Sequence, residues 1–334
     1  MKGVLILVLV LATASPLCGW NKGRPHGVAV VLPCPGEASS AYAIDSAPCW
    51  KDPNITGVLL RVNWRNIEPT PGNYDWSYID YGVQLCKSTD KFAQLSINFA
   101  EAPQWIYGLG AKPWYPKGTN DNSFMPTPWD PIFQQRAAAV IQAFGARYDQ
   151  MRVVKGVTMW AGGRNIETYF VQSPQNDAQL DAVGGPQIWI AAAETIIDEY
   201  AAAFPHTRIF LATGVAYPDH NATTTIVAQY LLSKYPSRSG LQSNGLSAHY
   251  PSYNNARGGV IFPHTNINID SVPAIIYQMV DQIGSSRIGS ATLADCLDNA
   301  NNSGADCVQV YPGDRATDPG EASIQYFNAW HNYR

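Results

Sequence analysis

Short runs of β-branched and aromatic residues recur along the chain and alternate with longer segments whose apolar residues follow a helical period. This alternation begins near residue 27 and continues to the end of the chain. Eight of the short runs are expected to form strands, namely Gly27–Leu32, Gly57–Asn63, Ala93–Phe99, Val154–Trp160, Arg208–Ala212, Gly245–Tyr250, Arg287–Ala291 and Cys307–Tyr311.

The segments between these runs predict helices. The clearest is Pro186–Phe204, and Pro131–Tyr148 is Ala-rich with apolar residues at helical spacing. Further helices are expected over Thr223–Tyr235, Ser271–Ile283, Leu293–Asn301 and Gly320–Tyr333. Strands that alternate with helices favour a parallel sheet with helices outside, which is an α/β fold. Eight repeats favour a closed (β/α)8 TIM barrel over an open sheet, and no Gly-rich dinucleotide fingerprint follows the first strand.

The N-terminus has the pattern of a secretory signal peptide over residues 1–19. Lys2 supplies a positive charge, Val4–Leu11 is an apolar run, and Ala12-Thr13-Ala14 offers a cleavage site. The run is too short to span a bilayer, and no later stretch reaches about 20 apolar residues, so no membrane span is predicted. A lipid anchor on Cys18 is a weaker alternative. We expect a secreted protein, extracellular or periplasmic, with one barrel domain over residues 20–334.

Composition narrows the range of partners. The net charge is −4 and no basic run is present, so a nucleic-acid partner is not expected. Only 14% of the residues are charged, against about 25% in typical domains. Trp and Tyr are numerous, at 10 and 18 residues. Most of these rings are expected in the core, but flat rings also suit the apolar faces of sugars.

Cysteine usage fits an oxidising compartment, where disulfides are expected. Two local pairs are predicted: Cys34–Cys49 would close the first loop, and Cys296–Cys307 would join a helix to the next strand. Cys86 is then free or pairs with Cys18. The sequence has neither a CxxC pair nor an HExxH motif, so no metal site and no cofactor are predicted. Glycosylation sequons begin at three asparagines, which are Asn54, Asn221 and Asn301.

Three segments between residues 57 and 165 resemble a known superfamily. The first is Gly57–Asp80, with Arg61 in a predicted strand and then Glu68-Pro69 and Tyr74-Asp75-Trp76. The others are the loop Pro126-Thr-Pro-Trp-Asp-Pro131 and the helix end Phe144-Gly-Ala-Arg-Tyr148. They are similar to β-galactosidase-like and endoglycanase-like barrels of the clan A glycoside hydrolases. The resemblance implies the (β/α)8 fold and a carbohydrate substrate or ligand, and leaves the oligomeric state open.

Members of that clan place one catalytic Glu after the fourth strand and another after the seventh. Glu167 follows the fourth predicted strand, so the resemblance assigns it the role of general acid/base, although Ile166 separates it from Asn165. The seventh predicted strand carries no carboxylate at its end. Glu101 and Asp314, near the ends of strands three and eight, are the candidates for the second carboxylate of a glycosidase.

Polar and aromatic residues near the strand ends are expected to line a sugar-binding pocket. Alternation along the eighth strand points Gln309 and Tyr311 into the barrel. In the same way, alternation along the second strand places Arg61 and Asn63 on one of its faces. The complete predicted set of substrate-binding residues is Arg61, Asn63, Trp64, Asn98, Trp105, Trp160, Asn165, His249, Tyr250, Gln309 and Tyr311.

Three functions fit these features. The first is a secreted glycoside hydrolase that uses Glu167. The second is a carbohydrate-binding protein that kept the barrel and lost the nucleophile, as the absent carboxylate of the seventh strand suggests. The third and weakest is an extracellular structural or assembly protein.

Overall fold

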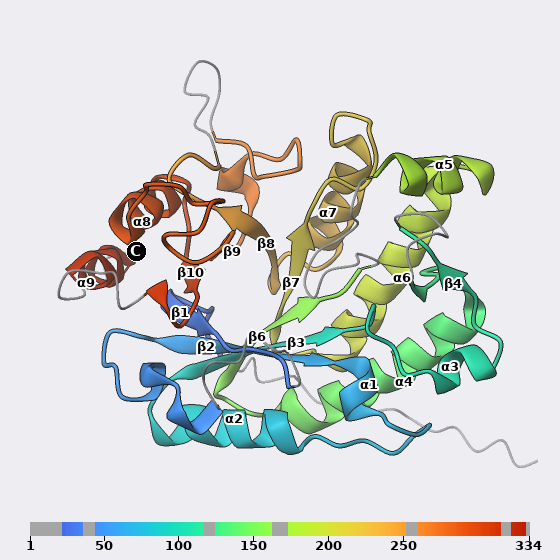
Figure 1. Cartoon of the computed structure of the whole chain (residues 1–334), viewed down its shortest axis with the longest axis horizontal. Helices are drawn as coiled ribbons and strands as arrows, with labels where there is room; N and C mark the ends of the chain where they lie inside the picture. The colour runs from blue at the N-terminus through green and yellow to red at the C-terminus, as the bar shows by residue number, and fades with distance from the viewer. Residues whose placement is uncertain are drawn as a thin grey trace, which may run out of the picture.

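Eight parallel strands form a closed barrel at the centre of the molecule (Figure 1). The computed structural model describes residues 22–35, 44–116, 124–161, 173–251, 260–314 and 322–331. Each barrel strand pairs with the next in sequence, and the last pairs with the first. In order, the strands are β1 (Gly27–Val31), β2 (Gly57–Asn63), β3 (Phe92–Asn98), β6 (Val154–Met159), β7 (Arg208–Thr213), β8 (Ser239–Leu246), β9 (Ile275–Met279) and β10 (Cys307–Val310). The predicted (β/α)8 barrel is therefore confirmed.

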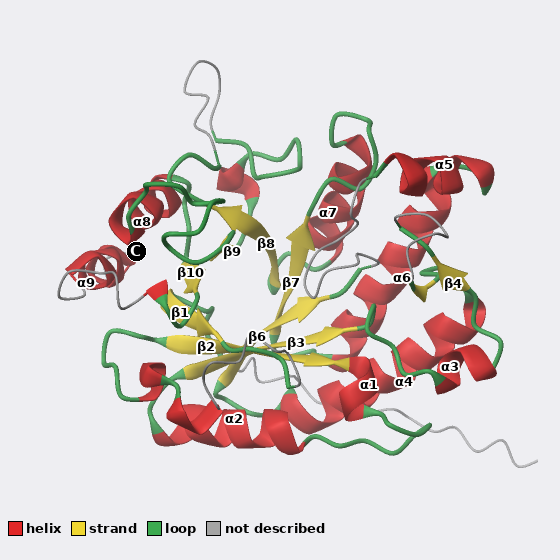
Figure 2. Ribbon diagram, in the orientation of Figure 1, coloured by secondary structure: helices red, strands yellow, loops and turns green. Residues whose placement is uncertain are grey.

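Helices surround this barrel (Figure 2). In the described part of the chain the α-helices are α1 (Trp64–Ile67), α2 (Ser77–Ser88), α3 (Trp105–Gly108), α4 (Pro131–Tyr148), α5 (Pro174–Ala182), α6 (Pro186–Ala203), α7 (Ala222–Lys234), α8 (Leu293–Asn302) and α9 (Ala322–His331). The short 3-10 helices are η1 (Ile44–Ser46), η2 (Pro48–Trp50) and η3 (Ile269–Ser271), and β4 (Pro113–Trp114) pairs antiparallel with β5 (Met125–Pro126). None of the described helices is both long enough and apolar enough to cross a membrane.

Local sequence signals explain why the long helices lie where they were predicted. Helix α4 begins after Asp130, whose carboxylate accepts hydrogen bonds from the backbone N–H groups of Ile132 and Phe133, each at 3.0 Å. Pro131 occupies the first helical position, where its missing N–H is not needed. The observed bounds match the prediction for α4, and those of α6, α7 and α8 match to within one residue at each end.

Large aromatic rings fill the amino-terminal end of the barrel because neighbouring strands carry glycine there. Phe92 and Phe210 belong to a buried apolar cluster that also contains Ala29, Ala274, Ile276 and Cys307. A Cβ atom on Gly240 would lie 2.4 Å from the Phe210 ring, and one on Gly57 would lie 2.4 Å from the Phe92 ring. The two glycines thus make the space that the two rings occupy.

A layer of uncharged polar side chains crosses the barrel above these rings. The amide of Gln94 on β3 donates to Thr158 Oγ1 on β6 at 2.6 Å and to Gln242 Oε1 on β8 at 3.0 Å. From β10, Gln309 Nε2 donates to Gln94 Oε1 at 2.9 Å. All four side chains are fully buried. Amides and hydroxyls bonded to one another therefore hold the middle of the barrel, which satisfies much of their hydrogen-bonding capacity without charge.

Two predicted strands are misplaced. The sixth is Ser239–Leu246 and not Gly245–Tyr250, and the seventh is Ile275–Met279, inside the segment predicted as a helix over Ser271–Ile283. The segment predicted as the seventh strand, Arg287–Ala291, consists mainly of turns. Every residue of β9 is buried, so it lacks the alternation of buried and exposed positions by which a strand is recognised.

The two predicted disulfides are also wrong, since no disulfide joins the described cysteines, whereas Cys86 is free, which was one of its two predicted states. Cys307 points into the barrel, where it belongs to the cluster with Phe92 and Phe210, whereas Cys296 lies on α8 in the core outside the barrel. Strand β10 therefore separates the two thiols. Cys49 lies near Cys86, whose pKa is raised mainly by burial and further by the neighbouring Cys49.

Candidate functional site

The carboxyl ends of the eight strands surround the mouth of the barrel, which is where TIM-barrel enzymes hold their substrates. Three predicted residues meet on its β2–β3 side. Asn63 and Asn98 are neighbours in the parallel register, and Asn98 Nδ2 donates to Asn63 Oδ1 at 3.2 Å. Arg61 is half-buried on the same face of β2, and its Nε donates to the backbone oxygen of Leu32 at 3.4 Å. These contacts order polar groups at the mouth.

The seventh barrel strand presents a glutamine to the interior. Gln278 on β9 is the register partner of Gln309 on β10, so the two side chains share the inner face. Gln278 Nε2 donates to Tyr311 Oη at 3.3 Å, which brings together β9 and the end of β10. The side-chain oxygens of Gln278 and Gln309 are buried and accept no hydrogen bond within the described residues. These two buried acceptors thus lack a protein donor within the described residues, which is uncommon for buried polar atoms.

The three tryptophans predicted to bind the sugar have different environments. Trp64 has no exposed surface, and its Nε1 donates to Glu68 Oε2 at 2.7 Å, so we assign it to the core. Trp105 is half-buried, with the guanidinium of Arg136 5.1 Å from its ring centroid. Trp160, at the end of β6, is fully buried, and its Nε1 has no described hydrogen-bond acceptor.

Neither candidate for the second carboxylate has the environment of a nucleophile. Glu101 forms an exposed ion pair with Arg65 at 2.8 Å. Asp314 is fully buried, and its two oxygens accept the backbone N–H groups of Ile283 at 2.7 Å and Tyr311 at 2.8 Å. Burial raises the pKa of Asp314 to about 6, and the nearby charge of Asp281 raises it further, while the two hydrogen bonds oppose the shift. Asp314 therefore joins the loops that follow β9 and β10.

Glu68 has a structural position although it lies in the segment that most resembles glycosidases. It is fully buried and accepts hydrogen bonds from Trp64 Nε1, from Gly72 N at 2.6 Å and from Arg136 Nη2 at 2.5 Å. Trp105 Nε1 donates to its backbone oxygen at 3.0 Å. Glu68 thus fixes the loop after β2 against α4.

The predicted residues at the end of the sixth strand face different neighbours. Tyr250 Oη lies 3.0 Å from His264 Nε2, and burial lowers the pKa of His264. His249 is exposed and borders a polar hollow of about 430 Å³, formed mainly with α8 and including Asp295 and Asp298. His249 therefore lies beside α8.

The predicted acid/base Glu167 and its neighbour Asn165 lie outside the described residues. Two further residues near the mouth were missed: Gln278 and Asp281, both hidden by the misplacement of the seventh strand. Asp281 is half-buried two positions after β9, and its Oδ1 accepts the backbone N–H of Gln282 at 2.8 Å. Within the described residues, no group of three or more His, Cys, Asp or Glu side chains is arranged to hold a metal ion.

Comparison with known proteins establishes similarity of fold. No protein-family model and no curated protein matches the sequence. Among solved structures, the chain is similar to the β-galactosidase of the psychrophilic Marinomonas ef1, with 11% identity, a TM-score of 0.57, and coverage of 92% of this chain and 59% of that one. The β-galactosidase of the Antarctic haloarchaeon Halorubrum lacusprofundi gives 11% identity, a TM-score of 0.57, and coverage of 91% and 57%.

A third similar structure is the cold-adapted β-galactosidase of Rahnella sp. R3, with 9% identity, a TM-score of 0.55, and coverage of 94% of this chain and 56% of that one. The chain therefore spans less than three fifths of the length of each of these enzymes. The resemblance to barrel glycosidases that the sequence predicts is thus confirmed at the level of the fold.

Proposed function

We propose that this protein binds carbohydrate in the mouth of the barrel without hydrolysing it. The observation that carries the proposal is Gln278, an amide on the inner face of the seventh strand. The carboxylate that follows this strand, Asp281, accepts the backbone N–H of Gln282 at 2.8 Å. An amide cannot attack an anomeric carbon and hold a glycosyl ester as a carboxylate does. In addition, none of the eight strands contains Asp or Glu within its bounds.

The polar groups at the mouth favour a neutral, hydroxyl-rich ligand. Gln278 Nε2 donates to Tyr311 Oη at 3.3 Å, and Asn98 Nδ2 donates to Asn63 Oδ1 at 3.2 Å. Sugar hydroxyls both donate and accept, so they match a surface of amides and phenols. The β-galactosidase structures of similar fold support carbohydrate as the ligand class. Extracellular location, predicted from residues 1–19, is part of the proposal because it would expose the mouth to polysaccharides.

The test combines turnover and binding on the purified protein. Activated aryl glycosides and a panel of polysaccharides are assayed for hydrolysis, and the same sugars, as oligosaccharides, are titrated calorimetrically. We expect binding to at least one oligosaccharide and no turnover. Gln278→Ala should weaken that binding by about tenfold, because one or two hydrogen bonds of about 1 kcal/mol each are lost. Gln142→Ala on the exposed face of α4 is the matched control and should bind as the wild type does.

Two outcomes would reject the proposal. Turnover that disappears in Glu167→Ala or Asp281→Asn would identify the protein as a hydrolase with a different pair of carboxylates. Absence of binding to every sugar tested would remove carbohydrate as the ligand.

A further inference from the structure

A large hollow lies at the opposite end of the barrel from the mouth. It has a volume of about 1180 Å³ and is bordered by α2, by the loops that precede β2 and β3, and by the start of β6. Helix α2 runs along the barrel beside β2 and β3 (Figure 1). The volume exceeds the roughly 300–1,000 Å³ of ordinary small-molecule pockets, so an organic ligand has room there.

The lining of this amino-end hollow is positively charged. Lys87, Lys91, Arg152 and Lys155 contribute four positive charges, while the acidic residues are Asp80 and Asp90. Asp80 is already bound by Arg147, whose Nε donates to Asp80 Oδ1 at 2.8 Å from outside the lining. The hollow therefore carries an excess of positive charge in a chain whose net charge is −4.

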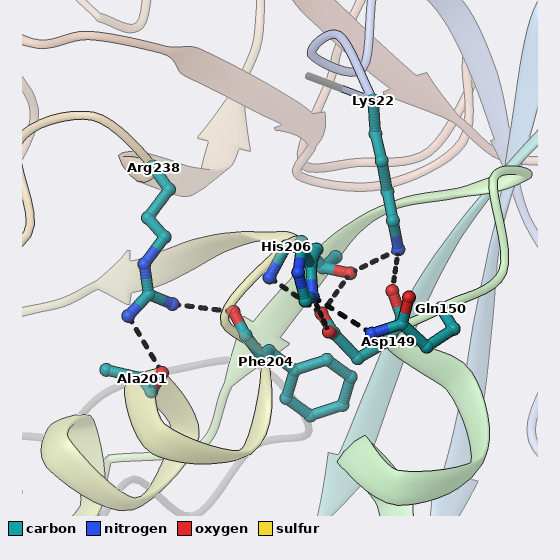
Figure 3. Close-up of polar contacts among 8 residues, drawn as sticks. Lys22, Asp149, Gln150, Ala201, Phe204, His206 and Arg238 are labelled. Atoms are coloured by element: carbon teal, nitrogen blue, oxygen red, sulfur yellow. Dashed lines mark hydrogen bonds and ion pairs between the residues drawn. The ribbon is translucent and has the colours of Figure 1, made fainter. Parts of the chain in front are cut away.

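Other cations at the same end have partners. Lys22 Nζ donates to Thr207 Oγ1 at 2.7 Å and to the backbone oxygen of Asp149 (Figure 3). Arg238 donates to the backbone oxygens of Phe204 at 2.6 Å and Ala201 at 2.8 Å. In the hollow itself, Lys91 Nζ donates to the backbone oxygens of Asp52 and Ile55 at 2.7 and 2.6 Å. These contacts hold the loops together and use the cations structurally.

Lys155 is different. It is half-buried, and its Nζ lies 5.6 Å from the ring centroid of Phe92. Burial lowers its pKa, and Asp90 is near enough to oppose that shift, but no ion pair joins Lys155 to an acidic residue in the described part of the chain. A desolvated ammonium without an ion-pair partner is stabilised when an anion approaches.

His26 stands beside Lys155 on the same aromatic ring, with its own ring centroid 6.1 Å from that of Phe92. Burial lowers the pKa of His26, and the positive charge of Lys155 lowers it further. An anion bound between the two would oppose the effect of the Lys155 charge and raise the pKa of His26, and the imidazole could then donate a hydrogen bond to it.

We propose that the amino-end hollow is a second binding site, for an organic anion that carries carboxylate, sulphate or phosphate groups. Lys155 and His26 would bind the anionic group, with Lys87 at the rim. The site is independent of carbohydrate binding at the mouth, since the two lie at opposite ends of the barrel.

The experiment uses the full chain at low ionic strength. A sulphated disaccharide, a digalacturonate, a sugar phosphate and inorganic phosphate are titrated, with cellobiose as the neutral control. Calorimetry gives the affinity, and the pH titration of the His26 imidazole signals by NMR reports the site. We expect an organic anion to bind and to raise the pKa of His26. Lys155→Gln should weaken binding at least about tenfold, while Lys155→Arg should largely keep it.

The matched control is Lys112→Gln, which removes the same charge from an exposed lysine outside the hollow. It should change the affinity less than twofold. The proposal is overturned if no anion shifts the His26 signals at about 10 mM, if Lys112→Gln and Lys155→Gln weaken binding equally, or if inorganic phosphate alone binds. Which organic anion binds most tightly identifies the group that the site recognises.

Discussion

Replacing Glu68, which is fully buried, should destabilise the protein more than replacing any exposed carboxylate. Its side chain is fully buried, and its partner Arg136 is 24% exposed. Glu68→Ala would remove the acceptor for Arg136, for Trp64 Nε1 and for the backbone N–H of Gly72 in one step. The loop after β2 would then lose its attachment to α4.

The expected loss follows from these contacts. Breaking a buried ion pair by removing one partner costs about 3–5 kcal/mol, because the other charge stays behind without compensation. We expect about 3 kcal/mol, the lower end, since Arg136 can reach water and also lies over the Trp105 ring. Such a loss is a large part of the roughly 5–15 kcal/mol by which domains are stable.

Urea unfolding followed by tryptophan fluorescence measures the change. Glu101→Ala is the matched control: its ion pair with Arg65 is exposed, so its removal should cost less than about 1 kcal/mol. The double variant Glu68→Ala/Arg136→Met should recover part of the loss, because no charge is left unpaired. A loss below about 1 kcal/mol in Glu68→Ala, or no recovery in the double variant, would refute the reasoning.

Two further predictions concern a barrel strand and the loops that follow β9 and β10. Gly240→Ala should lower the free energy of unfolding by about 1–3 kcal/mol, because the new Cβ would lie 2.4 Å from the Phe210 ring and 2.8 Å from the Ala274 carbonyl oxygen. Gly108→Ala is the control: its Cβ would meet no atom within 4 Å, so this variant should be as stable as the wild type or slightly more stable in thermal melts. In the folded protein the pKa of Asp314 is raised to about 6, whereas in the unfolded chain this carboxyl loses its proton near pH 4. The contribution of Asp314 to stability is therefore complete below about pH 4 and is lost as the pH rises through 6. The stability difference between wild type and Asp314→Asn should therefore fall by up to about 3 kcal/mol between pH 4 and pH 7 in urea titrations, and a constant difference would contradict the assignment.

The parts of the fold that follow local rules could be predicted from the sequence. Helix α4 carries its own start signal in Asp130 and Pro131, and the meeting of Asn63 with Asn98 follows once two parallel strands end in phase. Strand β9 could not be recognised, because Tyr277 and its neighbours are buried on both faces and give no period of two. The prediction therefore placed a strand around Ile288, in a segment of turns.

The same error hid the most informative site residue. Because the seventh strand was predicted at Arg287–Ala291, Gln278 was assigned to a helix. A catalytic carboxylate was therefore sought at the end of the wrong segment. The ion pair between Glu68 and Arg136 could not be predicted from the sequence for another reason. The two residues are 68 positions apart, and only the packing of α4 against the loop after β2 brings them together. Local patterns predict elements, whereas a buried ion pair depends on the assembled fold.

The chemistry of the barrel interior links these observations to function. A carboxylate on a strand facing the axis would need a cation or several donors to compensate its desolvation. The residues that cross this axis are instead Gln94, Thr158, Gln242 and Gln309, which bond to one another without charge. Gln278 continues that neutral set toward the mouth, where its side-chain oxygen is buried and has no hydrogen-bond donor within the described residues. A barrel interior of this kind holds together through uncharged hydrogen bonds and needs no carboxylate on its strands, which agrees with the carbohydrate binding proposed above.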